Sequence, residues 1–215
     1  MVNYQLWNNI RALSQLKKSG KKVGKLRYKT GNSFKTLNFN QSGFKIDFES
    51  KKLILSKIGS IPIKLHRQIR GKMKGVIVKR ERSGKWYAIV QVEGDEPEPL
   101  PPTGKTVGID IGIRHFLTDS DGRQVENPRF YERTLKRIKI LQRNLSRKVE
   151  GSENWEKCRI ELAKAYEKLV NQRNDFLHKL SRFYVNNYDV IVVEDLRVQN
   201  MARNHNLAQK ILDAS

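Results

Sequence analysis

Two carboxylates stand at the ends of apolar runs that are typical of buried β-strands. Asp110 lies in VGIDIGI, where Val and Ile alternate with small or polar residues over 107–113, and Glu194 directly follows the run VIVV. A buried strand rarely accepts a carboxylate that has no partner. If the two strands are neighbours, the carboxylates can face one another, and they repel unless one takes up a proton or a cation lies between them.

Mg²⁺ suits such a pair, because it takes oxygen ligands and keeps several of its waters. Paired Mg²⁺ ions held by acidic residues stabilise both the attacking and the leaving oxygen in phosphodiester cleavage. Asp195 comes directly after Glu194, and in a continuing strand it would point to the opposite face. We therefore prefer Glu194 as the second ligand, on the condition that the strand does not end one residue earlier.

Helical patterns separate the two strands, as expected for parallel neighbours in an α/β sheet. After Asp110, residues 115–128 (HFLTDSDGRQVENP) predict two further strands around an SDG turn. Apolar stripes at helical spacing then run over residues 131–148 and 154–185. Because the connection between them, VEGSEN, contains Gly and Ser, we expect an antiparallel helical hairpin.

The charge of the chain indicates a polyanionic partner. Its 215 residues include 43 Lys and Arg against 22 Asp and Glu, a formal net charge of +21. Such a field attracts nucleic acid, and the alternative is a basic protein at a membrane surface. No segment approaches the roughly 18 apolar residues of a spanning helix. The single cysteine, Cys158, excludes an internal disulfide and favours the cytoplasm.

A proline-rich segment divides the chain into two parts of different charge. Residues 93–105 (EGDEPEPLPPTGK) hold four of the six prolines and predict a linker, because proline continues neither a helix nor a central strand. Residues 1–104 carry +15 of the net charge, and residues 105–215 carry +6. The more basic part is expected to hold the main nucleic-acid surface.

Short strands dominate the expected first domain. After a helical start near residues 6–16, six strand candidates follow at short spacing between Gly- and Ser-containing turns, which predicts a small β-barrel or an open sandwich. Basic and aromatic residues share these strands and can follow a phosphate backbone and stack on bases. The predicted contact residues are His66, Arg67, Lys72, Lys74, Lys79, Arg80, Lys85, Trp86 and Tyr87. The alternative is a solvated outer face with Trp86 and Tyr87 in the core.

Five blocks of sequence, taken in order, resemble the TnpB (OrfB) proteins of insertion sequences, the transposon relatives of the type V CRISPR effectors. The resemblance runs from about residue 20 to the end of the chain. The blocks are LSKIGSIPIKLHRQIRGKMKGVIVKRERSGKWYAIVQVE, VGIDIGIRHFLTDSDG, QRNLSRKVEGSENWEKCR, NQRNDFLHKLSR and VIVVEDLRVQNMARNHNLAQKILDAS.

The resemblance implies an RNA-guided DNA endonuclease of transposon origin. It implies a remnant of a helical recognition region at residues 1–20, a wedge-like β-barrel at 21–104 and the N-terminal part of an RNase H-like (RuvC-type) nuclease domain at 105–215. Asp110 and Glu194 would be the first two catalytic acids, both ligating Mg²⁺ or Mn²⁺. The expected partners are a guide RNA and a double-stranded DNA target, with sequence read by base pairing.

The sequence departs from that family in two respects. Family members continue into a zinc ribbon of paired CxxC motifs and carry a third catalytic Asp, whereas this chain stops at Ser215 with one cysteine. We therefore expect zinc only in the missing C-terminal part, an incomplete metal site and no cleavage by this chain alone.

Two alternatives remain open. One is a catalytically dead nucleic-acid-binding remnant of such a nuclease. The other is an ATPase of RNase H-like fold, which is less favoured, because IGIRHF replaces the small residues that would cradle phosphates after Asp110.

Overall fold

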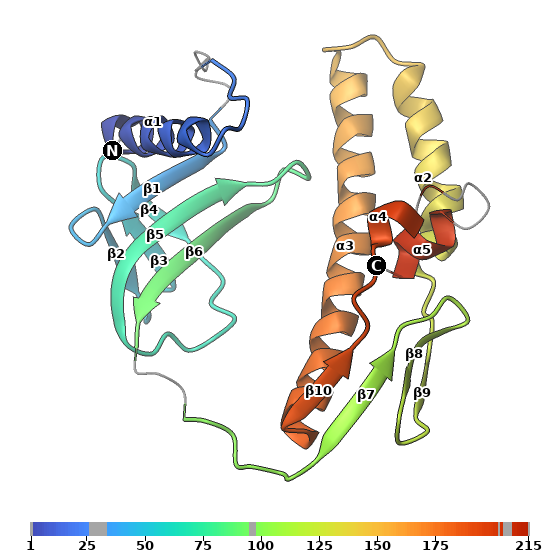
Figure 1. The fold of residues 1–215 in the computed structure, drawn as a ribbon. Helices are drawn as coiled ribbons and strands as arrows, with labels where there is room; N and C mark the ends of the chain where they lie inside the picture. The colour runs from blue at the N-terminus through green and yellow to red at the C-terminus, as the bar shows by residue number, and fades with distance from the viewer. Residues whose placement is uncertain (1, 26–33, 95–97, 202, 204–207, 215) are drawn as a thin grey trace. The chain divides into compact units, whose positions relative to one another are not determined.

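The computed structural model describes residues 2–25, 34–94, 98–201, 203 and 208–214. The chain is a mixed α/β protein that divides into two compact units, Met1–Pro97 and Glu98–Ser215 (Figure 1). Residues 95–97 of the predicted linker lie outside the described residues, and residues 98–105 contain neither helix nor strand. No helix within the described residues is long and apolar enough to cross a membrane.

Within its described residues, the first unit contains one helix and two antiparallel sheets. The helix is α1 (Val2–Lys18), and the number of strands is six, as predicted. One sheet has the order β1-β5-β6 and the other β2-β3-β4. The strands are β1 (Thr36–Asn40), β2 (Phe44–Asp47), β3 (Lys52–Leu55), β4 (Gly59–Pro62), β5 (Lys72–Arg80) and β6 (Trp86–Glu93).

The expected barrel is wrong for the described residues, because neither sheet closes on itself. The chain turns after β1, where the Gly43 amide donates to the Asn40 carbonyl oxygen at 2.8 Å. From that turn β2 pairs with β3, and β1 pairs with β5 instead. Side chains of both sheets share one core cluster, formed by Ile46, Leu53, Leu55, Val76 and Val78. The unit is therefore two small sheets joined through a common apolar core.

Strands β5 and β6 form a hairpin around the sequence RSGK, residues 82–85. Strands β5 and β6 pair from Lys72 and Glu93 to Arg80 and Trp86, and the Glu81 amide donates to the Lys85 carbonyl oxygen at 2.8 Å. Gly84 has a φ of +83°, a left-handed conformation that glycine adopts without strain.

The second unit is built on a four-stranded sheet of order β10-β7-β8-β9. Its strands are β7 (Thr106–Asp110), β8 (His115–Asp119), β9 (Gln124–Glu126) and β10 (Val190–Val193). The parallel pairing of β7 with β10 is confirmed, and β7, β8 and β9 pair antiparallel. The short helices α4 (Val198–Met201) and α5 (Ala208–Ala214) follow β10.

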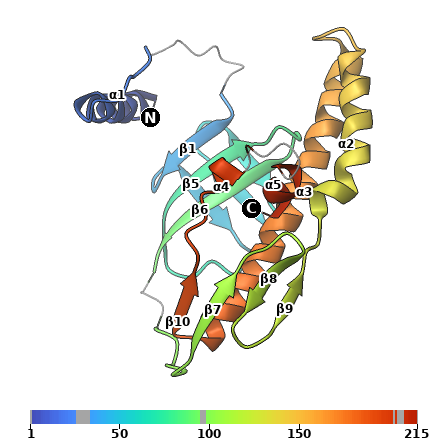
Figure 2. The same ribbon diagram turned by 45° about the vertical axis from the view of Figure 1, so that its right-hand side comes forward.

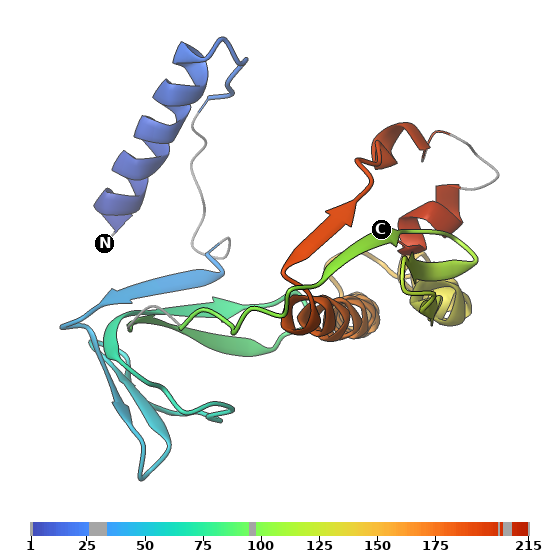
Figure 3. The same ribbon diagram turned by 60° about the horizontal axis from the view of Figure 1, so that its bottom comes forward.

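The predicted helical hairpin is α2 (Phe130–Ser146) and α3 (Glu153–Asn187), which lie side by side (Figures 1 and 3). Ser152 caps the start of helix α3, because its hydroxyl accepts a hydrogen bond from the Trp155 amide at 3.1 Å. The C-terminal half of α3 runs along one face of the sheet, with Leu180 and Tyr184 packed against strand residues (Figure 2). Where α2 meets α3, the core is Ile138, Ala165 and Leu169.

Candidate metal-binding and nucleic-acid sites

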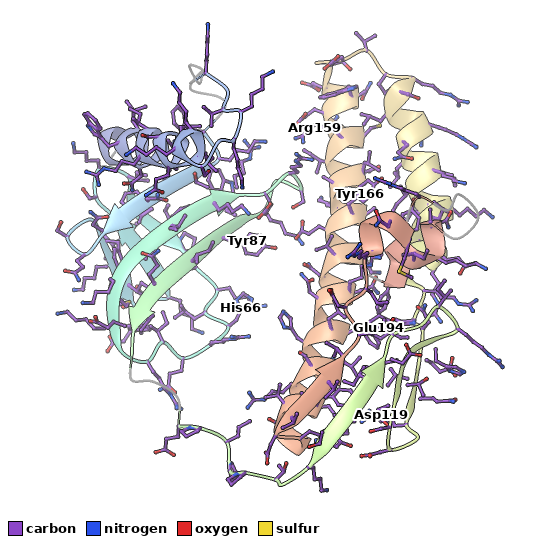
Figure 4. The ribbon with its side chains drawn as sticks, viewed as in Figure 1. His66, Tyr87, Asp119, Arg159, Tyr166 and Glu194 are labelled. Atoms are coloured by element: carbon purple, nitrogen blue, oxygen red, sulfur yellow. The ribbon has the colours of Figure 1, made fainter. Side chains whose placement is uncertain are left out.

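The register of β7 and β10 brings Asp110 and Glu194 to the same level of the sheet. The two strands are parallel, and Val193 pairs with Ile109. Asp110 is the last residue of β7, and Glu194 directly follows β10 at the strand end marked in Figure 4. Neighbouring strands lie about 4.8 Å apart. The two acids thus leave adjacent carboxyl ends of one sheet, the edge at which open α/β sheets bind ligands.

Alternation along β7 sets the side on which Asp110 lies. Val107 is fully buried in the cluster with α3, and Ile109 packs against the same cluster. Because successive side chains of a strand point to opposite faces, Asp110 faces away from α3. Thr118, its partner on β8, shares that face.

Strand β10 ends at Val193, so strand alternation alone cannot decide whether Glu194 or Asp195 points to the same face as Asp110. After β10 the chain bends, and the Leu196 amide donates to the Glu194 carbonyl oxygen at 3.1 Å. The register still favours Glu194, because it is the residue level with Asp110.

Both carboxylates are exposed and unpartnered. Among the described residues, neither the Asp110 nor the Glu194 carboxylate has a hydrogen bond or an ion pair. The same part of the chain contains no group of three or more His, Cys, Asp or Glu placed to hold a metal. The pair nevertheless offers the charged oxygen donors that Mg²⁺ prefers, and the ion would keep waters in its remaining positions.

Two nearby acids, Asp119 and Asp121, form hydrogen bonds that stabilise the fold. Asp119 is 6% exposed, and its carboxylate accepts hydrogen bonds from the Tyr184 hydroxyl at 2.8 Å and the Arg123 amide at 2.9 Å. It pairs with Ile109 and therefore lies on the α3 side of the sheet, opposite Asp110. Asp121 accepts from the Tyr188 hydroxyl at 2.5 Å. Asp119 and Asp121 thus hold the β8–β9 hairpin to α3 and to Tyr188, the residue that follows this helix.

The predicted nucleic-acid contacts of the first unit lie on several different elements. His66 and Arg67 are exposed in the connection between β4 and β5, and Lys85 lies in the β5–β6 turn. Lys74 forms an ion pair with Glu93 at 2.5 Å, and Lys79 forms one with Glu81 at 2.7 Å. The remaining four, Lys72, Arg80, Trp86 and Tyr87, are exposed on β5 and β6.

Strand alternation divides these residues between two faces. Val76 and Val78 point to the core, so Arg80 shares their side of β5, and Lys79 points to the other. Across the hairpin Trp86 pairs with Arg80, whose guanidinium carbon lies 5.8 Å from the Trp86 ring centroid. Tyr87 pairs with Lys79 on the outer face. The structure thus forms two basic–aromatic pairs on opposite faces rather than one continuous surface.

Asp213 has a role that the sequence analysis missed. Helix α2 begins after Arg129, which has a φ of +47° and gives no side-chain cap. The Asp213 carboxylate accepts instead from the amides of Tyr131 at 3.0 Å and Glu132 at 3.3 Å. Arg173 of α3 lies 3.4 Å from the same carboxylate. Asp213 therefore caps α2 from more than 80 residues away, and no local pattern announces it.

Comparison with known proteins decides the family. Residues 89–205, more than half of the chain, match the OrfB_IS605 family, described as "Probable transposase". The chain belongs to this family. Its predicted membership of the TnpB (OrfB) proteins is thereby confirmed.

Curated relatives carry names that fit this assignment. The chain is 36% identical over 161 residues to the "Putative RNA-guided DNA endonuclease InsQ" of Escherichia coli K12, an alignment covering 75% of this chain and 40% of the relative. It is 40% identical over 140 residues to a "Putative RNA-guided DNA endonuclease" of Streptomyces pristinaespiralis, covering 65% of this chain and 35% of the relative. The chain thus spans less than half the length of these relatives.

Proposed function

We propose that this chain belongs to an RNA-guided DNA endonuclease in which Asp110 and Glu194 hold Mg²⁺ or Mn²⁺ for phosphodiester cleavage. The observation that carries the proposal is the parallel register, which leaves two carboxylates level with each other at adjacent strand ends, neither with a partner among the described residues. The names of the relatives support the substrate class. The sheet order β10-β7-β8-β9, with β10 parallel to β7, supports an RNase H-like (RuvC-type) fold for the second unit.

Each carboxylate has a defined task in this proposal. Asp110 is fixed by β7, a central strand paired on both sides, and Glu194 is fixed by β10. Together they bind one cation and offset its charge. A bound Mg²⁺ would act as a Lewis acid toward a phosphodiester oxygen. The two acids therefore orient the cleaved phosphate at this sheet edge.

The basic surfaces have the complementary task of holding guide RNA and the target duplex. Most of the +21 charge lies in residues 1–104, and phosphate contacts set affinity and register without reading sequence. In an RNA-guided enzyme the guide pairs with one DNA strand and thereby reads the sequence. The protein then needs cations and stacking surfaces, which the Arg80–Trp86 and Lys79–Tyr87 pairs offer.

The direct test is metal binding by the 215-residue chain. Mn²⁺ binding is followed by electron paramagnetic resonance of the free ion in the wild type, Asp110→Asn, Glu194→Gln and the control Glu150→Gln. Glu150 is an exposed acid between α2 and α3. We expect Mn²⁺ affinity to fall in the two site variants and to stay unchanged in the control. Equal Mn²⁺ affinity in all four proteins would show that Asp110 and Glu194 do not form a metal site.

Nucleic-acid binding without cleavage is the second candidate function. Two carboxylates fix one cation, whereas in-line displacement uses two metal ions about 3.5–4 Å apart. The net charge of +21 supports tight polyanion binding by itself. A cleavage assay with Mg²⁺, cognate RNA and duplex DNA separates the two functions. Cutting that Asp110→Asn abolishes supports the nuclease, and RNA binding without cutting supports the binder.

A further inference from the structure

A hollow of about 260 Å³ lies between α2 and α3, away from the paired carboxylates. It is formed by one side of each helix where the two run side by side (Figure 1). Its lining residues are Phe130, Arg133, Thr134, Arg137, Ala165, Lys168 and Gln172. Three of these seven residues are cations, and none is an acid.

The three cations are brought together with no neutralising partner. Arg133 and Arg137 are four residues apart on α2 and so lie on the same helix face, and Lys168 comes from α3. Within the described residues none of the three forms an ion pair. Like charges at this spacing on one helix face repel each other and destabilise the helix. An anion bound between these cations would attract all of them and offset their mutual repulsion.

Nearby acids do not neutralise the hollow. Glu161 lies one helical turn before Ala165 but does not line it. Asp175, two helical turns beyond Lys168, is paired with Lys179 at 2.7 Å. The positive charge of the hollow is therefore available to a ligand.

The remaining lining residues shape the site for an oxyanion. Ala165 is buried and Phe130 is half-buried, with its ring 5.9 Å edge-to-face from Phe176, so the floor is apolar. The Thr134 hydroxyl donates to the Phe130 carbonyl oxygen at 2.8 Å, which uses its only proton. The donors left for a ligand are the two guanidinium groups, the Lys168 ammonium and the Gln172 amide.

We propose that this hollow binds a phosphate group of a nucleic-acid backbone. Guanidinium groups grip phosphate oxygens in bidentate fashion, and an ammonium adds a point charge. Arg133, Arg137 and Lys168 are all exposed, so a polymer can reach them from solvent. The hollow is built from charges and an apolar floor, which suits a sequence-independent contact. The inference rests on the proposed function only in taking nucleic acid as the partner.

The test compares two triple variants that remove the same charge. One carries Arg133→Gln, Arg137→Gln and Lys168→Gln. The other carries Lys136→Gln, Lys139→Gln and Lys157→Gln, at exposed positions of the same two helices that do not line the hollow. Binding of a fluorescent RNA–DNA hybrid is measured by anisotropy over a salt series. No divalent metal is present, so failure of the carboxylate site leaves this result unaffected.

We expect the hollow variant to lose more affinity than the control and to lower the salt slope by about one further unit, as for a lost phosphate contact. Its melting temperature should equal or exceed that of the wild type, because a repulsive cluster has been removed. Equal losses in the two triple variants would overturn the proposal, since the general field would then explain binding. Should the triple variant fail to fold, Lys168→Gln against Lys157→Gln gives the same comparison.

A second measurement separates a polymer from free phosphate. The side-chain Nε–H signals of Arg133 and Arg137 are followed by NMR during titration with the hybrid or with inorganic phosphate at matched ionic strength. Shifts with the hybrid alone support the backbone site. Equal shifts with inorganic phosphate would mean a small-anion site and would overturn the assignment to nucleic acid.

Discussion

The Tyr184 hydroxyl donates a 2.8 Å hydrogen bond to the buried carboxylate of Asp119. Tyr184 comes from α3, and Asp119 ends β8, next to the strand that carries Asp110. Burial first, and then the hydrogen bond to Asp119, raise the pKa of Tyr184 to about 12. This contact therefore joins the covering helix to the sheet at the level of the candidate metal site.

Replacing Tyr184 by Phe should destabilise the second unit by about 1–3 kcal/mol at neutral pH, because a buried carboxylate loses a donor. The stabilisation from neutral Tyr184 is fully present below its unfolded pKa of about 10 and is lost as pH rises through about 12. The difference in the free energy of unfolding between wild type and Tyr184→Phe, measured with urea, should therefore become smaller above pH 10. A difference that stays constant to pH 12 would contradict this account.

Removal of the Asp213 carboxylate should loosen the start of α2. Asp213→Ala leaves the amides of Tyr131 and Glu132 without their acceptor and should cost about 0.5–2 kcal/mol, the range for a lost helix cap. Asp213→Asn should cost less, because its side-chain oxygen can still accept. The measurement is urea unfolding, with exposed Lys210→Ala on the same helix as the control. Equal stability of Asp213→Ala and the control would show that the cap contributes nothing.

Asp189 should make the structure sensitive to acid. Its carboxylate accepts from the Thr103 amide at 2.9 Å and the Gly104 amide at 2.7 Å, and these hydrogen bonds lower the pKa of Asp189. A lowered folded pKa gives stability that is present above the unfolded value of about 3.9 and is lost as pH falls through the folded value. Asp189→Asn should thus melt earlier than wild type at pH 7.

The matched control for this prediction is Asp195→Asn, which changes an exposed acid beyond the opposite end of β10. It should melt as the wild type does at pH 7. The difference in melting temperature between wild type and Asp189→Asn should become smaller as the pH is lowered below about 4. A gap that is the same at pH 3 and pH 7 would mean that the charge of Asp189 does not stabilise the fold.

Sequence reasoning succeeded where one pattern determines one structure. The runs ending in Asp110 and Val193 are β-branched and apolar, and intervening helical stripes allow few arrangements other than parallel pairing. The barrel expectation failed because strand spacing does not determine which strands pair. In the structure β1 passes over three strands in sequence to pair with β5, a long-range choice set by the shared core.

The same limit applies to the candidate site residues, whose roles are proposals. Asp110 was recognisable because a carboxylate in an apolar run is unusual, and Glu194 because it ends a second such run. Asp213 gave no signal, since its partners are backbone amides of a helix far away in the sequence. The hollow between α2 and α3 was equally hidden, because Arg137 and Lys168 look like ordinary solvated residues until the helices pair.

The last prediction concerns salt dependence in the first unit. Lys74 and Lys79 are already paired with Glu93 and Glu81, whereas Lys72 and Arg80 form no ion pair with a described residue. A cation neutralised by a neighbouring acid releases fewer counterions from a polyanion, and each free phosphate contact contributes about 0.7–0.9 to the salt slope. Lys72→Gln with Arg80→Gln should therefore reduce the slope for RNA binding more than Lys74→Gln with Lys79→Gln does. The two double variants remove the same charge from the same strand, so each serves as the control for the other. Equal salt slopes in the two double variants would show that the net charge alone sets binding and that the ion pairs have no influence. If the RNA affinity of the wild type did not change with salt concentration, the inference of a polyanionic partner would be contradicted.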